Sequence, residues 1–109
     1  MPLYQITIDV QENKIDEFVR NLNSLWFRFM KEDGCLSYRV YREFEADGTF
    51  CMIGEYATHE AMENHFQTRD FEVLVGAAGV LGKAFKITIT EILEKGGSEL
   101  AKSKLTRHG

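Results

Sequence analysis

The sequence lacks the features that mark several large protein classes. Its 109 residues include 13 basic and 17 acidic side chains, for a net charge of −4, so it has no basic excess of the kind that binds nucleic acid or anionic membranes. No apolar run reaches the ~18 residues that a membrane-spanning helix needs. The N-terminal MPLYQITIDV lacks a basic segment ahead of its apolar residues, which argues against a signal peptide. We therefore expect a cytoplasmic protein with no nucleic-acid and no membrane partner.

Cysteine, histidine and glycine are present, but not in the patterns that bind metals or cofactors. Cys35 and Cys51 form no C-x-x-C, and their predicted strand positions lie roughly 20 Å apart, too far for a disulfide. His59 and His65 are six residues apart, a poor spacing for two ligands on one helix face. The glycines of GAAGVLG are spaced G-x-x-G-x-x-G within an apolar helix, unlike a nucleotide-binding loop. We expect no bound metal and no protein-bound cofactor.

Hydrophobic periodicity predicts strands at both ends of the chain, with helices and a hairpin between them. LYQITIDV (3–10) and FKITITEIL (85–93) alternate apolar and polar residues, as half-buried strands do. From Ile15 to Phe29, apolar residues recur at helical spacing over four to five turns. Strands at 36–43 and 50–56 form a predicted hairpin around an EADG turn. A short helix is predicted from a Thr58 cap to about Gln67. A third helix, capped by Asp70 and ended by Gly82, carries an apolar stripe of Phe71, Leu74, Val75 and Ala78.

This order, β-α-β-β-α(α)-β, predicts an α+β ferredoxin-like domain over residues 1–95. Residues 96–109 form a polar tail that we expect to be flexible, although SELAKSKL can form a turn or two of helix. Helices on one face of the sheet leave the other uncovered. On the second strand that uncovered face carries either Tyr38, Val40 and Arg42 or Ser37, Arg39 and Tyr41. Pairing two such sheets would protect both, so we expect a homodimer.

The segment from Lys14 to Leu81 resembles the antibiotic biosynthesis monooxygenase (ABM) family of the dimeric α+β barrel superfamily. The shared phrases are E-x-G-C-x-x-Y, V-Y-R, E-Y, E-A-x-x-x-H-F and D-F. In this chain they are Glu32–Gly34–Cys35–Tyr38, Val40–Arg42, Glu55–Tyr56, Glu60–Ala61–His65–Phe66 and Asp70–Phe71. The resemblance implies a dimeric barrel with a pocket between sheet and helices in each subunit.

The resemblance also carries functional expectations, although the family is functionally mixed. Its monooxygenases oxidise polycyclic phenols and quinols without flavin, metal or haem, while other relatives degrade haem and one branch isomerises a phosphorylated signalling sugar. Haem degraders use Asn, Trp and His where this chain has Ile6, His65 and Val75, so haem degradation is not expected. The resemblance implies a cofactor-independent monooxygenase whose partners are a small aromatic molecule and dioxygen. The alternatives are the sugar isomerase and a non-catalytic protein that binds an aromatic metabolite.

His65 and Glu55 are the candidate catalytic residues. His65 lies on the apolar face of the predicted second helix, and an unperturbed pKa near 6.5 suits proton abstraction near neutral pH. It could equally be a half-buried histidine of purely structural importance. Glu55 ends the third strand, where it could orient the histidine, bind a phenol, or pair with Arg39 or Arg69.

The candidate substrate-binding residues are mainly aromatic, because such pockets are largely apolar with a few polar groups. Tyr38 and Tyr41 point to opposite faces of one strand, so we expect at most one of them to line a given pocket. Trp26 either packs in the core or forms a pocket wall, and Arg69 either holds an anionic group or is a solvated charge at a helix end. The full set of candidates is Tyr38, Tyr41, Trp26, Phe66 and Arg69.

Overall fold

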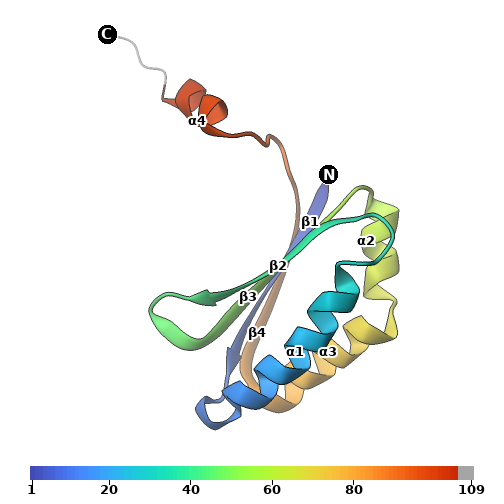
Figure 1. The fold of residues 1–109 in the computed structure, drawn as a ribbon, viewed down its shortest axis with the longest axis vertical. Coiled ribbons are helices and arrows are strands. Elements are labelled where there is room, and N and C mark those ends of the chain that lie inside the picture. Colours follow the sequence, from blue (N-terminus) through green and yellow to red (C-terminus); the bar gives the residue numbers. More distant parts are fainter. Residues whose placement is uncertain (106–109) are drawn as a thin grey trace.

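The computed structural model describes residues 1–105 and contains one antiparallel sheet with helices packed on one of its faces (Figure 1). The predicted α+β ferredoxin-like class and element order are confirmed. Of the predicted tail, residues 106–109 lie outside the described part of the chain. The elements are β1 (Pro2–Val10), η1 (Glu12–Lys14), α1 (Ile15–Phe29), β2 (Cys35–Glu43), β3 (Ala46–Tyr56), α2 (His59–Phe66), α3 (Arg69–Leu81), β4 (Gly82–Glu91) and α4 (Ser98–Lys104).

The strands are ordered β2-β3-β1-β4, so β2 and β4 form the edges of the sheet. In the observed register, Gly54 of β3 lies between Tyr4 of β1 and Tyr38 of β2. All three therefore share one face of the sheet. Tyr4 and Tyr38 lie in the core between the sheet and the helices, so this is the face on which α1, α2 and α3 pack. A side chain at position 54 would collide with both tyrosines, because a Cβ there would lie 2.8 Å from Tyr4 and 3.0 Å from Tyr38.

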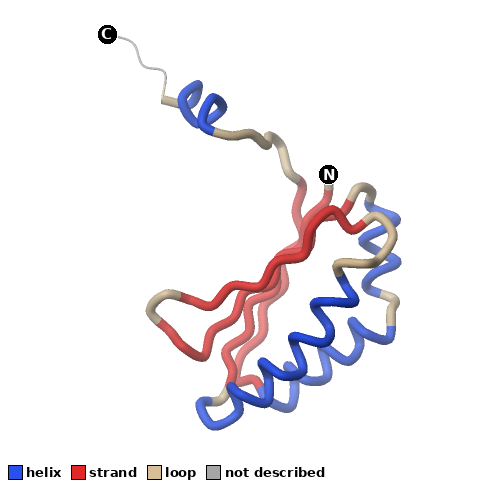
Figure 2. Tube along the Cα trace, in the orientation of Figure 1, coloured by secondary structure: helices blue, strands red, loops and turns tan. Residues whose placement is uncertain are grey.

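The register also decides which residues occupy the second face of the sheet. Since Tyr38 faces the helices, Ser37, Arg39 and Tyr41 alternate onto the opposite face. Within residues 1–105, α1, α2 and α3 all lie on the other side (Figure 2). Beyond β4 the chain leads into α4, which projects from the body (Figure 1).

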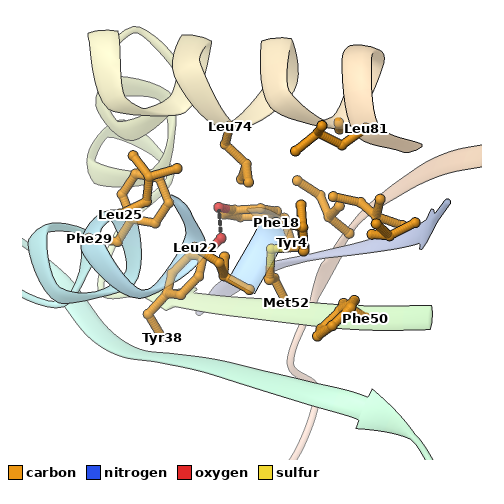
Figure 3. Close-up of a cluster of buried hydrophobic side chains, with 14 of the residues drawn as sticks. Tyr4, Phe18, Leu22, Leu25, Phe29, Tyr38, Phe50, Met52, Leu74 and Leu81 are labelled. Atoms are coloured by element: carbon orange, nitrogen blue, oxygen red, sulfur yellow. Dashed lines mark hydrogen bonds between the residues drawn. The ribbon is translucent and has the colours of Figure 1, made fainter. Parts of the chain in front are cut away.

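The core lies between the sheet and the helices (Figure 3). The helical spacing of α1 places Phe18, Leu22, Leu25 and Phe29 on one buried side. The strand and α3 residues that complete this layer include Tyr4, Ile6, Ile8, Val10, Tyr38, Phe50, Met52, Tyr56, Leu74, Ala78 and Leu81. Burial of this apolar surface is the main favourable term holding the helices on the sheet.

Three local predictions were wrong in detail. The hairpin turn lies at residues 44–45, so β3 begins at Ala46 instead of residue 50. Thr68, not Asp70, caps α3, because its hydroxyl accepts the Phe71 N–H at 3.1 Å while Asp70 pairs with Arg28. Val75 is 43% exposed on the outer side of α3. The predicted Thr58 cap and Gly82 stop are confirmed.

Both cysteines are unbridged. No helix in residues 1–105 combines the length and apolar character that crossing a membrane requires. The predicted short helix in SELAKSKL is present as α4.

The turn between α1 and β2 is fixed by a close contact with α2. Gly34 has a φ of +80°, in the left-handed region that glycine adopts without steric cost. A Cβ at this position would lie 2.5 Å from the Cβ of Ala61. The Gly34 carbonyl also accepts the Ala57 N–H at 2.8 Å. The turn and the start of α2 are therefore held together by backbone contact.

We expect Gly34→Ala to lower the free energy of unfolding by about 1–3 kcal/mol, because the new methyl group meets Ala61 and the backbone is strained. Gly79→Ala is the matched control, since nothing lies within 4 Å of a Cβ there and alanine favours the helix by about 0.5–1 kcal/mol. Urea unfolding of both variants measures the difference. Equal stability of the two variants would contradict the role given to this contact.

Candidate active site

A groove of about 730 Å³ runs between α1 and the edge strand β2. Buried side chains form its floor, half-buried ones its walls and exposed ones its rim. Its lining residues are Val19, Leu22, Asn23, Trp26, Met30, Leu36, Ser37, Tyr38, Arg39, Val40, Tyr41, Arg42 and Phe50. The groove is thus largely apolar and aromatic, with two guanidinium groups at its rim.

The Trp26 side chain of α1 is fixed to β2, because its indole N–H donates to the Tyr38 carbonyl at 2.7 Å. Arg42 lies over the ring of Phe50, 4.9 Å from its centroid, and its guanidinium donates to the Asp47 carbonyl. Trp26 therefore presents a fixed aromatic surface, and Arg42 is already engaged within the hairpin.

Behind the groove floor lies a buried chain of polar side chains. The Tyr4 hydroxyl lies 2.6 Å from the Tyr38 hydroxyl, drawn as a dashed line in Figure 3, and 2.6 Å from His65 Nε2. The other ring nitrogen of His65, Nδ1, lies 2.6 Å from Glu32 Oε1. The chain joins four parts of the fold: β2, β1, α2 and the turn after α1.

The polar chain runs through an aromatic cluster. The His65 ring centroid lies 4.7 Å from that of Phe29, 5.7 Å from Phe66 and 5.1 Å from Phe71. His65 is 1% exposed and Tyr4 is fully buried. The cluster fills the interior between sheet and helices, and the groove lies beside it at the edge of the sheet, between α1 and β2.

Burial shifts the pKa of each of the four hydrogen-bonded side chains, Tyr38, Tyr4, His65 and Glu32, toward the value that favours its neutral form. It lowers the pKa of His65 to about 4, against the opposing charge of Asp70. Burial, with the negative charge of Asp70, raises the pKa of Glu32 to about 7. Burial also raises the pKa values of the Tyr4 and Tyr38 hydroxyls well above their ordinary range. Near neutral pH, Glu32 is therefore the member that changes charge.

Glu55 does not contact His65. It alternates with Tyr56 onto the opposite face of the sheet, where Lys95 Nζ donates to its two carboxylate oxygens at 2.8 and 3.1 Å. The Ser37 hydroxyl adds a bond of 3.3 Å. Lys95 lowers the pKa of Glu55. The predicted arginine partners were wrong, and the carboxylate beside His65 is Glu32.

The structure divides the predicted binding residues into three groups. Trp26, Tyr38 and Tyr41 all line the groove. The expectation that only one tyrosine could line a pocket was wrong, because β2 is an edge strand and the groove reaches residues from both of its faces. Phe66 packs beside His65, and Arg69 is exposed at the first position of α3, outside the groove lining.

Sequence reasoning did not identify Glu32 and Tyr4 as site residues. Glu32 belongs to the E-x-G-C phrase. Ala61 and His65 are four residues apart, so these two residues share one side of α2. Contact of that side with the turn at Gly34 is what brings Glu32 to His65. Nothing in the strand pattern distinguishes Tyr4 from an ordinary core residue. Within residues 1–105, no three His, Cys, Asp or Glu side chains gather as a metal site.

Glu32→Gln and Glu55→Gln should change stability with opposite pH trends. Between pH 4.5 and about 7 the unfolded Glu32 is ionised while the folded one is protonated, so the contribution of Glu32 to wild-type stability falls as pH rises. Glu32→Gln should therefore gain stability relative to wild type across this window. The lowered pKa of Glu55 stabilises the fold fully above pH 4.5 and less as the pH falls below it. The deficit of Glu55→Gln relative to wild type should therefore grow as pH rises to about 4.5 and stay constant from there to pH 7. Urea unfolding at several pH values measures both, and parallel trends would contradict these environments.

Comparison with known proteins agrees with this architecture. The family model for antibiotic biosynthesis monooxygenase (ABM) matches residues 1–77. An uncharacterized protein of Synechocystis sp., sll1783, is 30% identical over 88 residues, which make up 80% of this chain and 60% of that protein. The chain thus spans less than two thirds of that relative's length.

Solved structures share the fold closely. A Deinococcus radiodurans protein provisionally assigned as an antibiotic biosynthesis monooxygenase superposes with a TM-score of 0.83 at 22% identity, covering 89% of this chain and 97% of that one. PA3566 from Pseudomonas aeruginosa superposes with a TM-score of 0.75 at 26% identity, covering 85% and 95%. With the family model matching most of its length, the chain belongs to the antibiotic biosynthesis monooxygenase family.

Proposed function

We propose that the chain is a cofactor-independent monooxygenase that oxidises a quinol or polycyclic phenol bound in the groove between α1 and β2. One observation carries the proposal. Tyr38 belongs both to the floor of an aromatic groove and to a buried chain of titratable side chains. A ring bound in the groove would therefore lie against a group that can pass its proton into the protein.

The groove suits a flat, electron-rich ring. Trp26 is fixed by its bond to the Tyr38 carbonyl, and Tyr41, which is 50% exposed, can cover a bound ring from the rim. Aromatic side chains pack against ring ligands in offset or edge-on contacts. Arg39 at the rim can hold the negative charge that develops on a phenol oxygen.

The chemistry requires no bound redox group, because the substrate is itself the reductant. Loss of a proton gives an electron-rich anion, which passes one electron to dioxygen. The substrate radical and superoxide then combine to form a carbon–oxygen bond. At a ring CH₂ group, as in an anthrone, cleavage of the peroxide leaves one oxygen as a carbonyl and releases the other as water with the two hydrogens of that carbon. The protein supplies the base, the hydrogen bonds and an apolar surrounding.

His65 has the proton-accepting role in this proposal, and it acts through Tyr4 and Tyr38 because its own ring is buried. Phe66 packs against the imidazole and helps to fix it. Glu55 takes no part, since it does not line the groove and its carboxylate is bonded to Lys95 and Ser37.

The phosphorylated-sugar isomerase is a weaker candidate. A phosphate needs several cations that converge on one site, and of the basic residues that the structure describes only Arg39 and Arg42 line the groove. Arg42 is already bonded to the Asp47 carbonyl. The aromatic floor favours a ring over a sugar phosphate.

Oxygen uptake with a panel of hydroquinones and anthrones tests the proposal. We expect uptake above the autoxidation rate, lowered about 100-fold or more in His65→Ala, the typical contribution of a general base. His59→Ala is the control, because that histidine is exposed on α2 and lies outside the polar chain. Circular dichroism establishes that both variants fold. Ring binding without uptake in wild type would favour the non-catalytic binding protein.

We also propose that two copies pair through the uncovered face of the sheet. This face carries Ile53 beside polar residues such as Thr7 and Thr88, a mixture that suits a wet interface between sheets. Pairing would cover Tyr41, which is exposed on the same face.

Ile53→Glu should convert a dimer into a monomer, because it places a charge in the centre of this face. Val80→Glu is the matched control, since Val80 is 74% exposed on α3, away from the uncovered face. Light scattering after size exclusion gives both masses. A wild-type monomer, or a dimer that survives Ile53→Glu but not Val80→Glu, would contradict this interface.

A further inference from the structure

We infer that Glu32 is the final acceptor of the substrate proton, which reaches it from the groove through Tyr38, Tyr4 and His65. The inference rests on the proposed function and deepens it. In this assignment the Glu32 carboxylate accepts the proton, and His65 takes up one proton and passes another on.

The geometry provides an unbroken path with distinct ends. Three successive contacts of 2.6 Å link Tyr38, Tyr4, His65 and Glu32. Tyr38 belongs to the groove floor, whereas the Glu32 side chain is 20% exposed and can exchange a proton with water. The two inner members are closed off from solvent. A proton that enters at the groove can therefore leave at Glu32.

The transfers balance, because Tyr38, Tyr4 and His65 each take up one proton and give up one. The single negative charge passes from Glu32 to the substrate. At the start Glu32 is ionised, His65 donates Nδ1–H to it, and Nε2 accepts the Tyr4 hydroxyl. When the substrate gives its proton to Tyr38, Tyr38 passes its own to Tyr4 and Tyr4 passes its own to Nε2. The Nδ1 proton then moves to Glu32. At the end the substrate is an anion, Glu32 is neutral and His65 is neutral with its proton on Nε2.

The surroundings favour this end state over a histidinium. His65 lies among Phe29, Phe66 and Phe71, where a positive charge would lose its hydration. Glu32 has access to water, and its pKa of about 7 lets it both accept and release a proton near neutral pH.

The titratable groups around the pair come from every neighbouring element. Asp70, held by Arg28, adds negative charge near Glu32 from α3. Burial raises the pKa of each remaining neighbour, so these groups stay protonated at neutral pH. They are Tyr4 on β1, Cys35 and Tyr38 on β2, and Tyr56 on β3.

Nitrogen-15 NMR of the histidine rings in the full chain tests the path without substrate. As pH rises through about 7, the His65 proton should move from Nε2 to Nδ1 while the ring stays neutral. Glu32→Gln should abolish this titration, whereas Glu63→Gln, an exposed substitution on α2, should leave it unchanged. A ring that becomes cationic in this range, or a titration that survives Glu32→Gln, would overturn the inference.

Oxygen uptake then separates this inference from the proposed function. If the chain is an oxygenase, Glu32→Gln should lower uptake about 100-fold and remove the rise in rate with an apparent pKa near 7. Tyr4→Phe should also lower uptake, yet leave the NMR titration of the Glu32–His65 pair. Normal uptake in both variants would overturn the path and keep the oxygenase. A titration that depends on Glu32, without uptake in wild type, would support the path and contradict the oxygenase.

Discussion

The buried hydrogen-bonded chain from Tyr38 to Glu32 constrains the relative positions of four parts of the fold. A polar group taken out of water costs free energy unless it finds a partner, and Tyr4 and His65 are almost fully buried. Among residues 1–105, their side chains bond to each other, to Tyr38 and to Glu32. Displacement of β1, β2, α2 or the turn after α1 would leave one of them unpaired. The site and the packing of the domain are therefore stabilised by the same contacts.

Two glycines make this arrangement sterically possible. Gly54 leaves room on β3 for the two tyrosines on either side of it, and Gly34 lets the turn after α1 approach Ala61 of α2. Neither glycine belongs to the hydrogen-bonded chain. A side chain at either position would push two members of the hydrogen-bonded chain apart. Close backbone approach, as much as polar bonding, thus positions the site.

The sequence predicted the fold well, because alternation along the strands and the apolar side of α1 are local properties. The errors arose where a choice depended on neighbours that the pattern does not reveal. Thr68 and Asp70 are both able to cap α3, and contact with Arg28 draws Asp70 away. His65 was identified as a site candidate from its place on α2. Its partner depends on register and on the turn at Gly34, and the strand pattern alone indicates Glu55, at the end of a strand, where the structure has Glu32.

The open groove and the buried titratable residues occupy different regions of the structure, which suits a reaction that passes through an anion. A cavity that held both ring and base would have to remain open to admit substrate, and water would then reach the base. Here the groove at the edge of the sheet is open, while His65 and Tyr4 are sealed inside an aromatic cluster. Tyr38 is the shared member, so charge can be transmitted between the two regions without water entering the interior. Because an edge strand exposes both of its faces, the groove brings together Trp26, Tyr38 and Tyr41, the residues that the proposed function assigns to ring binding, at the surface of the domain.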